Sequence, residues 1–131
     1  MAGRRAARRA ALFMLYRWDV TGEPLEPPHE GEVDPFAVET AEAVAARASE
    51  LDRRITEAAE GWTADRLGAV ERNVLRIGVY ELETGSVPAE VAIAEAVLLA
   101  KRYASDEAGK LVNGILAAIA REGGVTREVR R

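Results

Sequence analysis

Apolar side chains recur every three or four residues in segment after segment of this chain, and strand-type alternation appears nowhere in the sequence. This spacing gathers apolar side chains on one face of an α-helix. Proline, glycine or a small polar residue separates one segment from the next, as is usual at the ends of helices. Ala, Leu, Glu and Arg are abundant, and these residues lose little on entering a helix. The sequence therefore predicts an all-α fold, built as a bundle.

These breaks divide the chain into predicted helices over about 4–20, 35–48, 50–61, 64–84, 88–103 and 106–122. Four of the helices are predicted to begin with a capping side chain, from Asp34, Ser49, Thr63 and Ser105. The segment 88–103 is apolar almost all round, which predicts that it is the central, buried helix. The last helix is predicted to end at Gly123-Gly124.

The length of 131 residues fits one compact domain, which we expect to span residues 1–122. Within it, residues 21–33 contain three prolines and two glycines and are predicted to form a flexible linker. Residues 123–131 are expected to form a basic C-terminal tail. No apolar run is long enough to span a bilayer, and the arginine-rich start lacks the apolar segment of a secretory signal. We therefore expect a cytoplasmic protein without a membrane anchor.

Several classes of chemistry find no support in the sequence. The chain contains no cysteine, which excludes disulfides, thiolate catalysis and cysteine-type zinc sites. Its single histidine, His29, stands between prolines and acids with no other candidate ligand nearby. Neither a phosphate-cradling loop nor a metal-ligand spacing occurs. We therefore expect no catalytic residue, no metal and no cofactor, and hence not an enzyme.

Charge is distributed unevenly along the chain. The net charge is −4, yet the N-terminal segment carries only arginines up to position 17, and the first acid follows at position 19. In the first predicted helix, Arg5, Arg9 and Tyr16 fall on one stripe nearly opposite the apolar face. Arg4 and Arg8 lie on the flank of that stripe. Arginine with tyrosine is typical of single-stranded RNA recognition, which combines phosphate contacts with base stacking. The alternative is a solvated arginine face with a surface tyrosine.

The dipeptide Asn113-Gly114 falls inside the last predicted helix. Helical periodicity continues on both sides of it, which argues against a hairpin turn. A glycine inside a helix costs about 1 kcal/mol relative to alanine, so we expect a compensating need. Two explanations stay open: close approach of a neighbouring helix, or a position beside a ligand.

Five stretches of the chain, taken in order, resemble the NusB family. They are Arg4 to Tyr16, Trp62 to Leu67, Val74 to Leu82, Val87 to Lys101, and Lys110 to Leu116. No single stretch is decisive, but their order and spacing hold over nearly the whole chain outside the linker and the tail. The resemblance implies a compact bundle of about six to seven helices.

The resemblance also implies a transcription antitermination factor that acts by binding RNA. Family members bind boxA-type single-stranded RNA in nascent ribosomal RNA transcripts, together with a small-subunit ribosomal protein called NusE, in the transcription elongation complex. By match to the family's motifs, the expected RNA-binding residues are Arg4, Arg5, Arg8, Tyr16, Tyr103, Glu107 and Lys110, and Arg9 extends the same stripe. Glu71 falls where the partner-binding surface is expected.

Two positions depart from the family's pattern. Ala94 stands where the family commonly has asparagine, and Leu111 where it commonly has phenylalanine. Alanine cannot make the hydrogen bonds of that asparagine, and leucine cannot stack on a base as phenylalanine does. The expected consequence is either a lower RNA affinity or a greater dependence on Tyr16 and Tyr103.

A second class of function would also account for the helices. A helical protein–protein interaction module, or a homodimer, needs amphipathic helices but no specific RNA binding. Only the arginine and tyrosine stripe and the family resemblance favour RNA over this alternative. The sequence leaves the choice between monomer and homodimer open.

Overall fold

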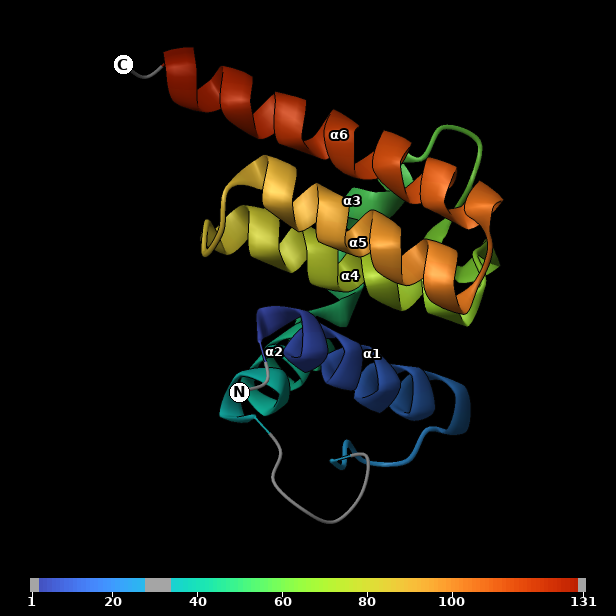
Figure 1. Cartoon of the computed structure of the whole chain (residues 1–131). Coiled ribbons are helices and arrows are strands. Elements are labelled where there is room, and N and C mark those ends of the chain that lie inside the picture. The colour runs from blue at the N-terminus through green and yellow to red at the C-terminus, as the bar shows by residue number, and fades with distance from the viewer. Residues whose placement is uncertain (1–2, 28–33, 130–131) are drawn as a thin grey trace.

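The computed structural model describes residues 3–27 and 34–129, with side chains described up to Glu122. This part of the chain contains six α-helices, one short 3₁₀ helix and no strand, so the predicted all-α bundle is confirmed (Figure 1). The elements are α1 (Arg4–Thr21), α2 (Pro35–Ala46), α3 (Ala48–Ala58), the 3₁₀ helix η1 (Ala64–Arg66), α4 (Ala69–Thr84), α5 (Ala89–Tyr103) and α6 (Asp106–Val129). None of the described helices is both long and apolar enough to cross a membrane.

Helix α4 lies at the centre of the bundle and packs against all five other α-helices. Figure 1 shows α1 and α2 on one side of α4, and α5 and α6 on the other. The prediction that the helix over 88–103 is central is wrong, because α5 buries only one face and leaves Val91 and Leu98 exposed by 39% and 47%. The apolar composition of a helix does not predict how many other helices will pack against it. In α4, ion pairs allow charged side chains to lie inside, so α4 is more buried than its composition suggests.

The helix starts agree with the predicted caps at two of four positions. Asp34 accepts a hydrogen bond from the backbone N–H of Phe36 at 2.9 Å, ahead of proline at the first position of α2. The Ser105 hydroxyl accepts one from the N–H of Ala108 at 3.0 Å and caps α6. Both capping predictions are therefore confirmed.

The other two capping predictions are wrong. Helix α3 begins one residue before Ser49, directly after α2, so the chain turns there without a capping side chain. Thr63 precedes η1 rather than a long helix and makes no side-chain cap, and α4 starts only after Gly68. Short polar residues favour helix starts, but tertiary packing decides which of them is used.

The C-terminal boundary also differs from the prediction. Helix α6 continues through Gly123 and Gly124 to Val129, so the expected stop at the glycine pair is wrong. Glycine raises the cost of a helix by only about 1 kcal/mol per residue and does not force its end. Near the other end of the chain, residues 22–27 of the predicted linker lack regular secondary structure, while residues 28–33, with His29, lie outside the described residues.

Two glycines inside helices differ in their surroundings. A Cβ on Gly78 of α4 would lie 2.6 Å from Cδ1 of the buried Leu116, so the absence of a side chain lets α6 approach α4. A Cβ on Gly114 of α6 would meet no described atom within 4 Å. Close helix packing therefore explains why a glycine stands at position 78, but it does not explain the glycine at position 114.

A cluster of polar side chains joins α1, α3 and α4. Asp19 Oδ2 accepts hydrogen bonds from Arg72 Nε at 2.8 Å, Asn73 Nδ2 at 2.9 Å and Arg76 Nη1 at 3.2 Å. The guanidinium of Arg76 also donates twice to the carboxylate of Asp52, at 2.7 Å each. Burial alone would raise the pKa of Asp19, but the hydrogen bonds and nearby guanidinium groups outweigh it and hold that pKa below its ordinary value.

The two glycines give a matched pair of substitutions. Gly114→Ala should raise the free energy of unfolding by about 0.5–1 kcal/mol, because alanine loses less entropy in a helix and has room here. In Gly78→Ala the same gain is offset by overpacking of about 1–3 kcal/mol against Leu116. Urea unfolding should therefore show a higher midpoint for Gly114→Ala than for Gly78→Ala. Equal midpoints would mean that α6 does not approach α4 closely at this point.

The Asp19 cluster predicts a specific pH dependence of stability. Because the pKa of Asp19 is lowered by folding, its contribution is complete above the ordinary carboxyl pKa and is lost as the pH falls through the lowered value. Asp19→Asn should cost about 2 kcal/mol at pH 7, where charged hydrogen bonds are removed. The difference from wild type should shrink below about pH 4. Urea unfolding of both proteins across this pH range measures the difference in their free energy of unfolding. A difference that does not change with pH would contradict the lowered pKa of Asp19.

Candidate functional site

A groove of about 350 Å³ runs between α1 and α5 and holds several of the residues singled out in the sequence. Its lining consists of Arg5, Arg9, Glu95, Leu98, Leu99, Lys101, Arg102 and Tyr103. The fold thus brings two arginines of the first helix into one groove with an aromatic residue more than ninety positions later in the chain. Four of the eight lining residues are cationic and one is acidic, so the groove is suited to a negatively charged ligand with a flat, apolar part.

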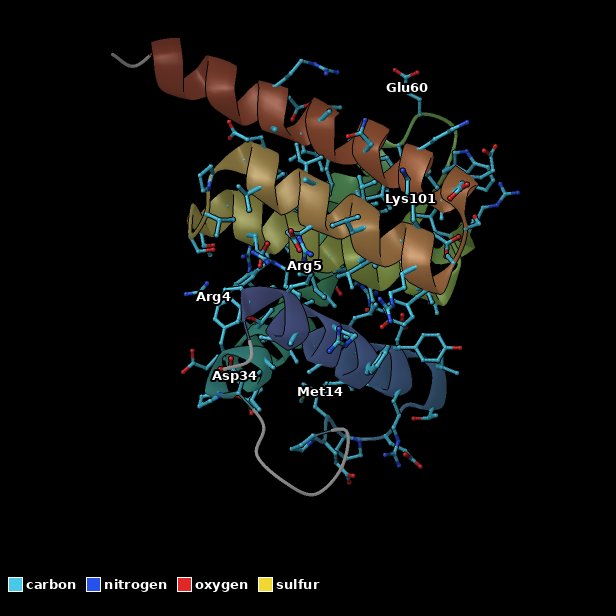
Figure 2. The ribbon with its side chains drawn as sticks, in the orientation of Figure 1. Arg4, Arg5, Met14, Asp34, Glu60 and Lys101 are labelled. Carbon is cyan, nitrogen blue, oxygen red and sulfur yellow. The ribbon has the colours of Figure 1, made fainter. Side chains whose placement is uncertain are left out.

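Arg5 is exposed but already paired in this groove. Its Nε donates to Glu95 Oε1 at 3.0 Å and its Nη2 donates to Glu95 Oε2 at 2.8 Å. The Arg5 side chain is 70% exposed, whereas that of Glu95 is only 14% exposed. The hydrogen bonds from Arg5 lower the pKa of Glu95, so the carboxylate is ionised at neutral pH. Figure 2 shows Arg5 extending from α1 toward α5.

Arg8 lies inside the protein, and the expectation that it flanks a solvent-facing stripe is wrong. The residue is only 4% exposed, and its Nε donates to both oxygens of Glu81, at 3.1 and 2.8 Å. Burial raises the pKa of the Glu81 carboxyl, and the hydrogen bonds from Arg8 oppose that rise. Arg8 shares a helix face with Leu12 and Leu15, both fully buried. A guanidinium in this place holds α1 on α4 rather than facing a ligand.

Arg4 extends away from the groove. Its guanidinium carbon lies 3.9 Å from the ring centroid of Phe36 in α2, the distance of a cation–π contact. Arg9 lies in the groove, and within the described part of the chain no acid forms an ion pair with it. The four N-terminal arginines therefore have four different environments.

The aromatic residues are divided between two places. Tyr103 is half-buried in the groove, where its ring meets that of Phe13 edge-on at 5.2 Å, and the guanidinium of Arg102 lies 5.6 Å from its centroid. Tyr16 is 42% exposed on α1 and is not part of the groove lining. Stacking on a planar ligand is possible at both residues, but only Tyr103 lies among the cations of the groove.

The remaining predicted residues lie outside the groove. Glu107 and Lys110 are almost fully exposed on the first turns of α6, with 3.5 Å between Lys110 Nζ and Glu107 Oε1. Glu71 lies half-buried in the first turn of α4, with its carboxylate folded over Gly68. The groove does not include these three positions.

Sequence reasoning missed five residues of the groove, and Glu95 is one of them. Leu98 and Leu99 provide its apolar lining, and Lys101 and Arg102 add charge beside Tyr103. A signal was present, because an otherwise apolar helix becomes basic only at these two positions. The stem of Lys101 packs across Gly109 of α6, where an added Cβ would lie 2.6 Å from Lys101 Cγ. Figure 2 shows Lys101 between α5 and the first part of α6, and the residue also lines the groove.

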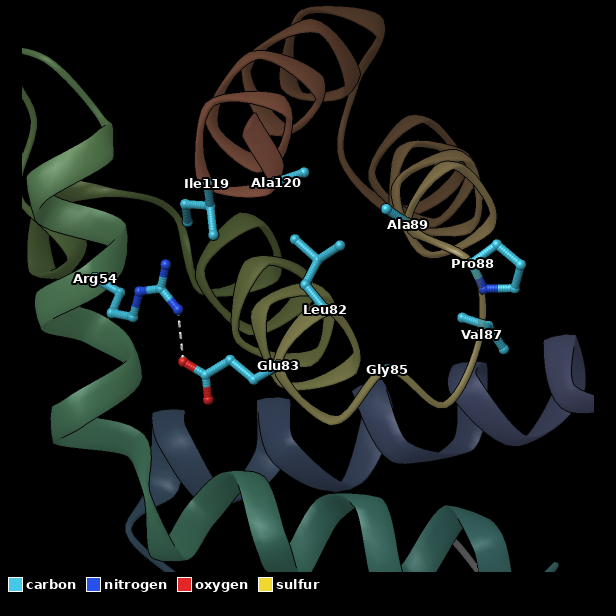
Figure 3. A pocket seen from close by; sticks show the side chains of 9 residues that line it. All are labelled: Arg54, Leu82, Glu83, Gly85, Val87, Pro88, Ala89, Ile119 and Ala120. Atoms are coloured by element: carbon cyan, nitrogen blue, oxygen red, sulfur yellow. Dashed lines mark hydrogen bonds and ion pairs between the residues drawn. The ribbon is translucent and has the colours of Figure 1, made fainter. Parts of the chain in front are cut away.

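A second hollow, of about 470 Å³, lies beside the turn that joins α4 to α5 (Figure 3). Its lining is mostly apolar, with Leu82, Val87 and Ile119 among its residues. Its charged groups neutralise one another, because Glu83 accepts a hydrogen bond from Arg54 at 2.8 Å. None of the candidate site residues predicted from the sequence lies here, and within the described residues no group of three His, Asp or Glu side chains is placed to hold a metal ion. The groove is therefore the better candidate site.

Comparison with known proteins gives a consistent result. The model of the NusB family matches residues 5–121. The transcription antitermination protein NusB of Solibacter usitatus is 39% identical, with 93% of this chain and 91% of that protein covered, and the NusB of Rubrobacter xylanophilus is 41% identical, with 86% of each covered. A solved structure of T. maritima NusB superposes with a TM-score of 0.83 at 36% identity, covering 92% of both chains. A chain from the structure of the antitermination factors NusB and NusE in complex with dsRNA superposes with a TM-score of 0.78 at 35% identity, covering 91% of this chain and 96% of that one.

The different environments of Arg8 and Arg9 predict different effects on stability. Arg8→Ala should lower the free energy of unfolding by about 3–5 kcal/mol, because it leaves the carboxylate of Glu81 buried without its partner. Arg9→Ala should change it by no more than about 0.5 kcal/mol. Urea unfolding of both variants measures the difference. Equal stabilities would mean that the Arg8–Glu81 pair does not hold α1 in place.

Proposed function

Because the chain belongs to the NusB family, we propose that it is a transcription antitermination factor that binds boxA-type single-stranded RNA of nascent ribosomal RNA transcripts together with NusE. It acts in the cytoplasm, within the transcription elongation complex, by binding and not by catalysis. The observation that carries this proposal is the groove between α1 and α5, whose lining combines four cations with Tyr103. The solved complex of NusB and NusE with RNA supports the choice of partners.

Electrostatic attraction to the RNA backbone comes from the cations that have no partner inside the protein. Within the described residues, Arg9 and Lys101 form no ion pair with an acid. Each such cation that meets a phosphate releases condensed counterions, so affinity falls as salt rises. Arg5 can add a further contact at its exposed side. Few cations and a net charge of −4 together favour modest affinity of the free protein.

Selectivity would come from bases held against the aromatic side chains. Tyr103 is fixed by Phe13 and Arg102, so a base that stacks on it costs little side-chain entropy. Stacking on an aromatic ring contributes about 1–3 kcal/mol per base. Tyr16, Glu107 and Lys110 lie outside the groove, and we propose that they contact RNA that extends beyond it.

NusE would supply what this surface lacks. A ribosomal protein that adds basic surface beside the groove offsets the negative charge of the body and raises affinity for RNA. Glu71, at the start of α4, is the residue that we propose for contact with NusE. The exposed Val91 and Leu98 of α5 favour the alternative function, a protein–protein interaction module or homodimer without specific RNA binding.

RNA binding can be measured by fluorescence anisotropy with a labelled single-stranded boxA-type RNA, its scrambled sequence and its duplex, at two salt concentrations, with and without NusE. We expect preference for single-stranded boxA RNA, loss of affinity at high salt and a gain with NusE. Combining Arg9→Ala with Lys101→Met should weaken binding and lower the salt slope by about 2, that is, about 1 for each lost phosphate contact. Methionine retains the stem that packs against Gly109.

Arg53→Ala is the matched control, because Arg53 is exposed on α3 and lies outside the groove lining. It should leave the salt slope close to that of wild type. Equal binding of boxA and scrambled RNA, even with NusE present, would favour the protein–protein interaction module. An equal loss of slope in Arg53→Ala would mean that the groove is not the binding surface.

A further inference from the structure

Four charged side chains form a connected row from the exposed edge of the groove to the protein interior. Arg5 and Arg8 come from α1, Glu95 from α5 and Glu81 from α4. Arg5 pairs with Glu95, and Arg8 pairs with Glu81. Exposure decreases along the row, from 70% for the Arg5 side chain to 2% for that of Glu81.

The two ion pairs are adjacent but not joined by a hydrogen bond. Arg8 Nη1 lies 3.9 Å from Glu95 Oε1, which is close enough for attraction but too far for a hydrogen bond. Arg8 Nη2 is buried and has no hydrogen-bond partner within the described part of the chain. A buried donor without a partner is costly and rare in folded proteins. Arg8 therefore keeps spare donor capacity next to a carboxylate that another arginine occupies.

This arrangement changes the charge that the N-terminal arginines offer to a ligand. Glu81 neutralises Arg8, and Glu95 neutralises Arg5 through the Nε and Nη2 edge of its guanidinium. That edge is one of the faces on which a guanidinium binds phosphate with two parallel hydrogen bonds. A phosphate that approaches Arg5 in this way must displace Glu95.

We propose that Glu95 sets the affinity of the groove for nucleic-acid phosphate: it holds Arg5 in the free protein and moves onto Arg8 when a phosphate takes Arg5. This inference rests on the proposed function, since it assigns the phosphate to RNA. Movement of the carboxylate by less than 1 Å would bring Glu95 within hydrogen-bond distance of Arg8 Nη1, because the only hydrogen bonds that Arg8 donates from its side chain to described residues come from Nε. The buried Arg8 thus acts on binding as a positioning residue, through Glu95, without touching RNA.

The expected magnitude follows from the exposure of the pair. Ion pairs near the surface are weak, and competition from one of them lowers the affinity for a ligand by about twofold to fivefold. Removing the charge of Glu95 should therefore tighten binding by this factor, and only while Arg5 is present. A general increase in positive charge would instead act whether or not Arg5 is present.

The experiment is a double-substitution cycle with the full chain, using Glu95→Gln, Arg5→Ala and the combination. Glutamine keeps the shape of the side chain, and unfolding curves report whether each variant is folded. The probes are labelled single-stranded oligouridine, which tests phosphate binding without a boxA sequence, and the boxA-type RNA.

Glu90→Gln is the matched control, since Glu90 is an exposed acid on the same helix. We expect Glu95→Gln to bind oligouridine about twofold to fivefold more tightly than wild type does. When Arg5 is already alanine, adding Glu95→Gln should leave the affinity for oligouridine unchanged.

Weaker or unchanged oligouridine binding by Glu95→Gln, or no binding at all, would overturn the inference. So would equal tightening in the Arg5→Ala background or in Glu90→Gln, because either result would reflect net charge alone. Failure of the proposed function looks different. In that case wild type would not prefer boxA RNA over oligouridine. Glu95→Gln would still tighten oligouridine binding, and only while Arg5 is present.

NMR gives a second measurement that a merely structural role would not alter. The side-chain N–H of Arg5 should shift when oligouridine saturates the wild-type protein, because its acceptor changes from carboxylate to phosphate. The side-chain N–H signals of Arg8 should shift in the same titration, although Arg8 is buried. An unchanged Arg8 signal beside a shifted Arg5 signal would overturn the transfer of Glu95.

Discussion

The bundle depends on the charged contacts that fix α1 against α4. Arg8 and Asp19 are eleven residues apart on α1, about three helical turns, so they lie on the same face with Leu12 and Leu15 between them. At one end Arg8 meets Glu81, and at the other Asp19 meets the arginines of α4. Each buried charge is costly unless its partner is in place. The two contacts therefore set both the rotation and the register of α1.

The position of α1 in turn decides which arginines reach the groove. With Arg8 facing α4, Arg5 and Arg9 fall on the side that faces α5, and Arg4 falls over Phe36 of α2. Helix α5 brings Lys101 and Tyr103 to the opposite wall. The binding surface is thus a consequence of internal ion pairs. Its charge is smaller than a count of arginines suggests, because Glu95 and Glu81 each neutralise one.

Much of the fold could be predicted from local signals. Apolar spacing gave the helices, and short polar side chains at Asp34 and Ser105 marked two helix starts that the structure confirms. The same kind of signal failed at Ser49 and Thr63, where packing of the next segment moved the start. For the candidate site, Arg5, Arg9 and Tyr103 do meet in one groove, but Tyr16, Glu107 and Lys110 lie outside its lining. Whether these residues bind RNA stays a prediction.

The amino-acid pattern alone predicts that the chain is helical, where most of its helices lie, and that its N-terminus is basic, because these properties follow from neighbours within about four residues. The packing of the helices against one another makes α4 central, lets Gly78 and not Gly114 allow a close approach, and buries Arg8 while Arg9 stays available. Adjacent residues on a helix differ by about 100° in direction, and the sequence pattern cannot tell which direction a partner carboxylate will occupy. That carboxylate comes from Glu81, seventy-three positions away, so its effect on Arg8 exists only in the folded chain.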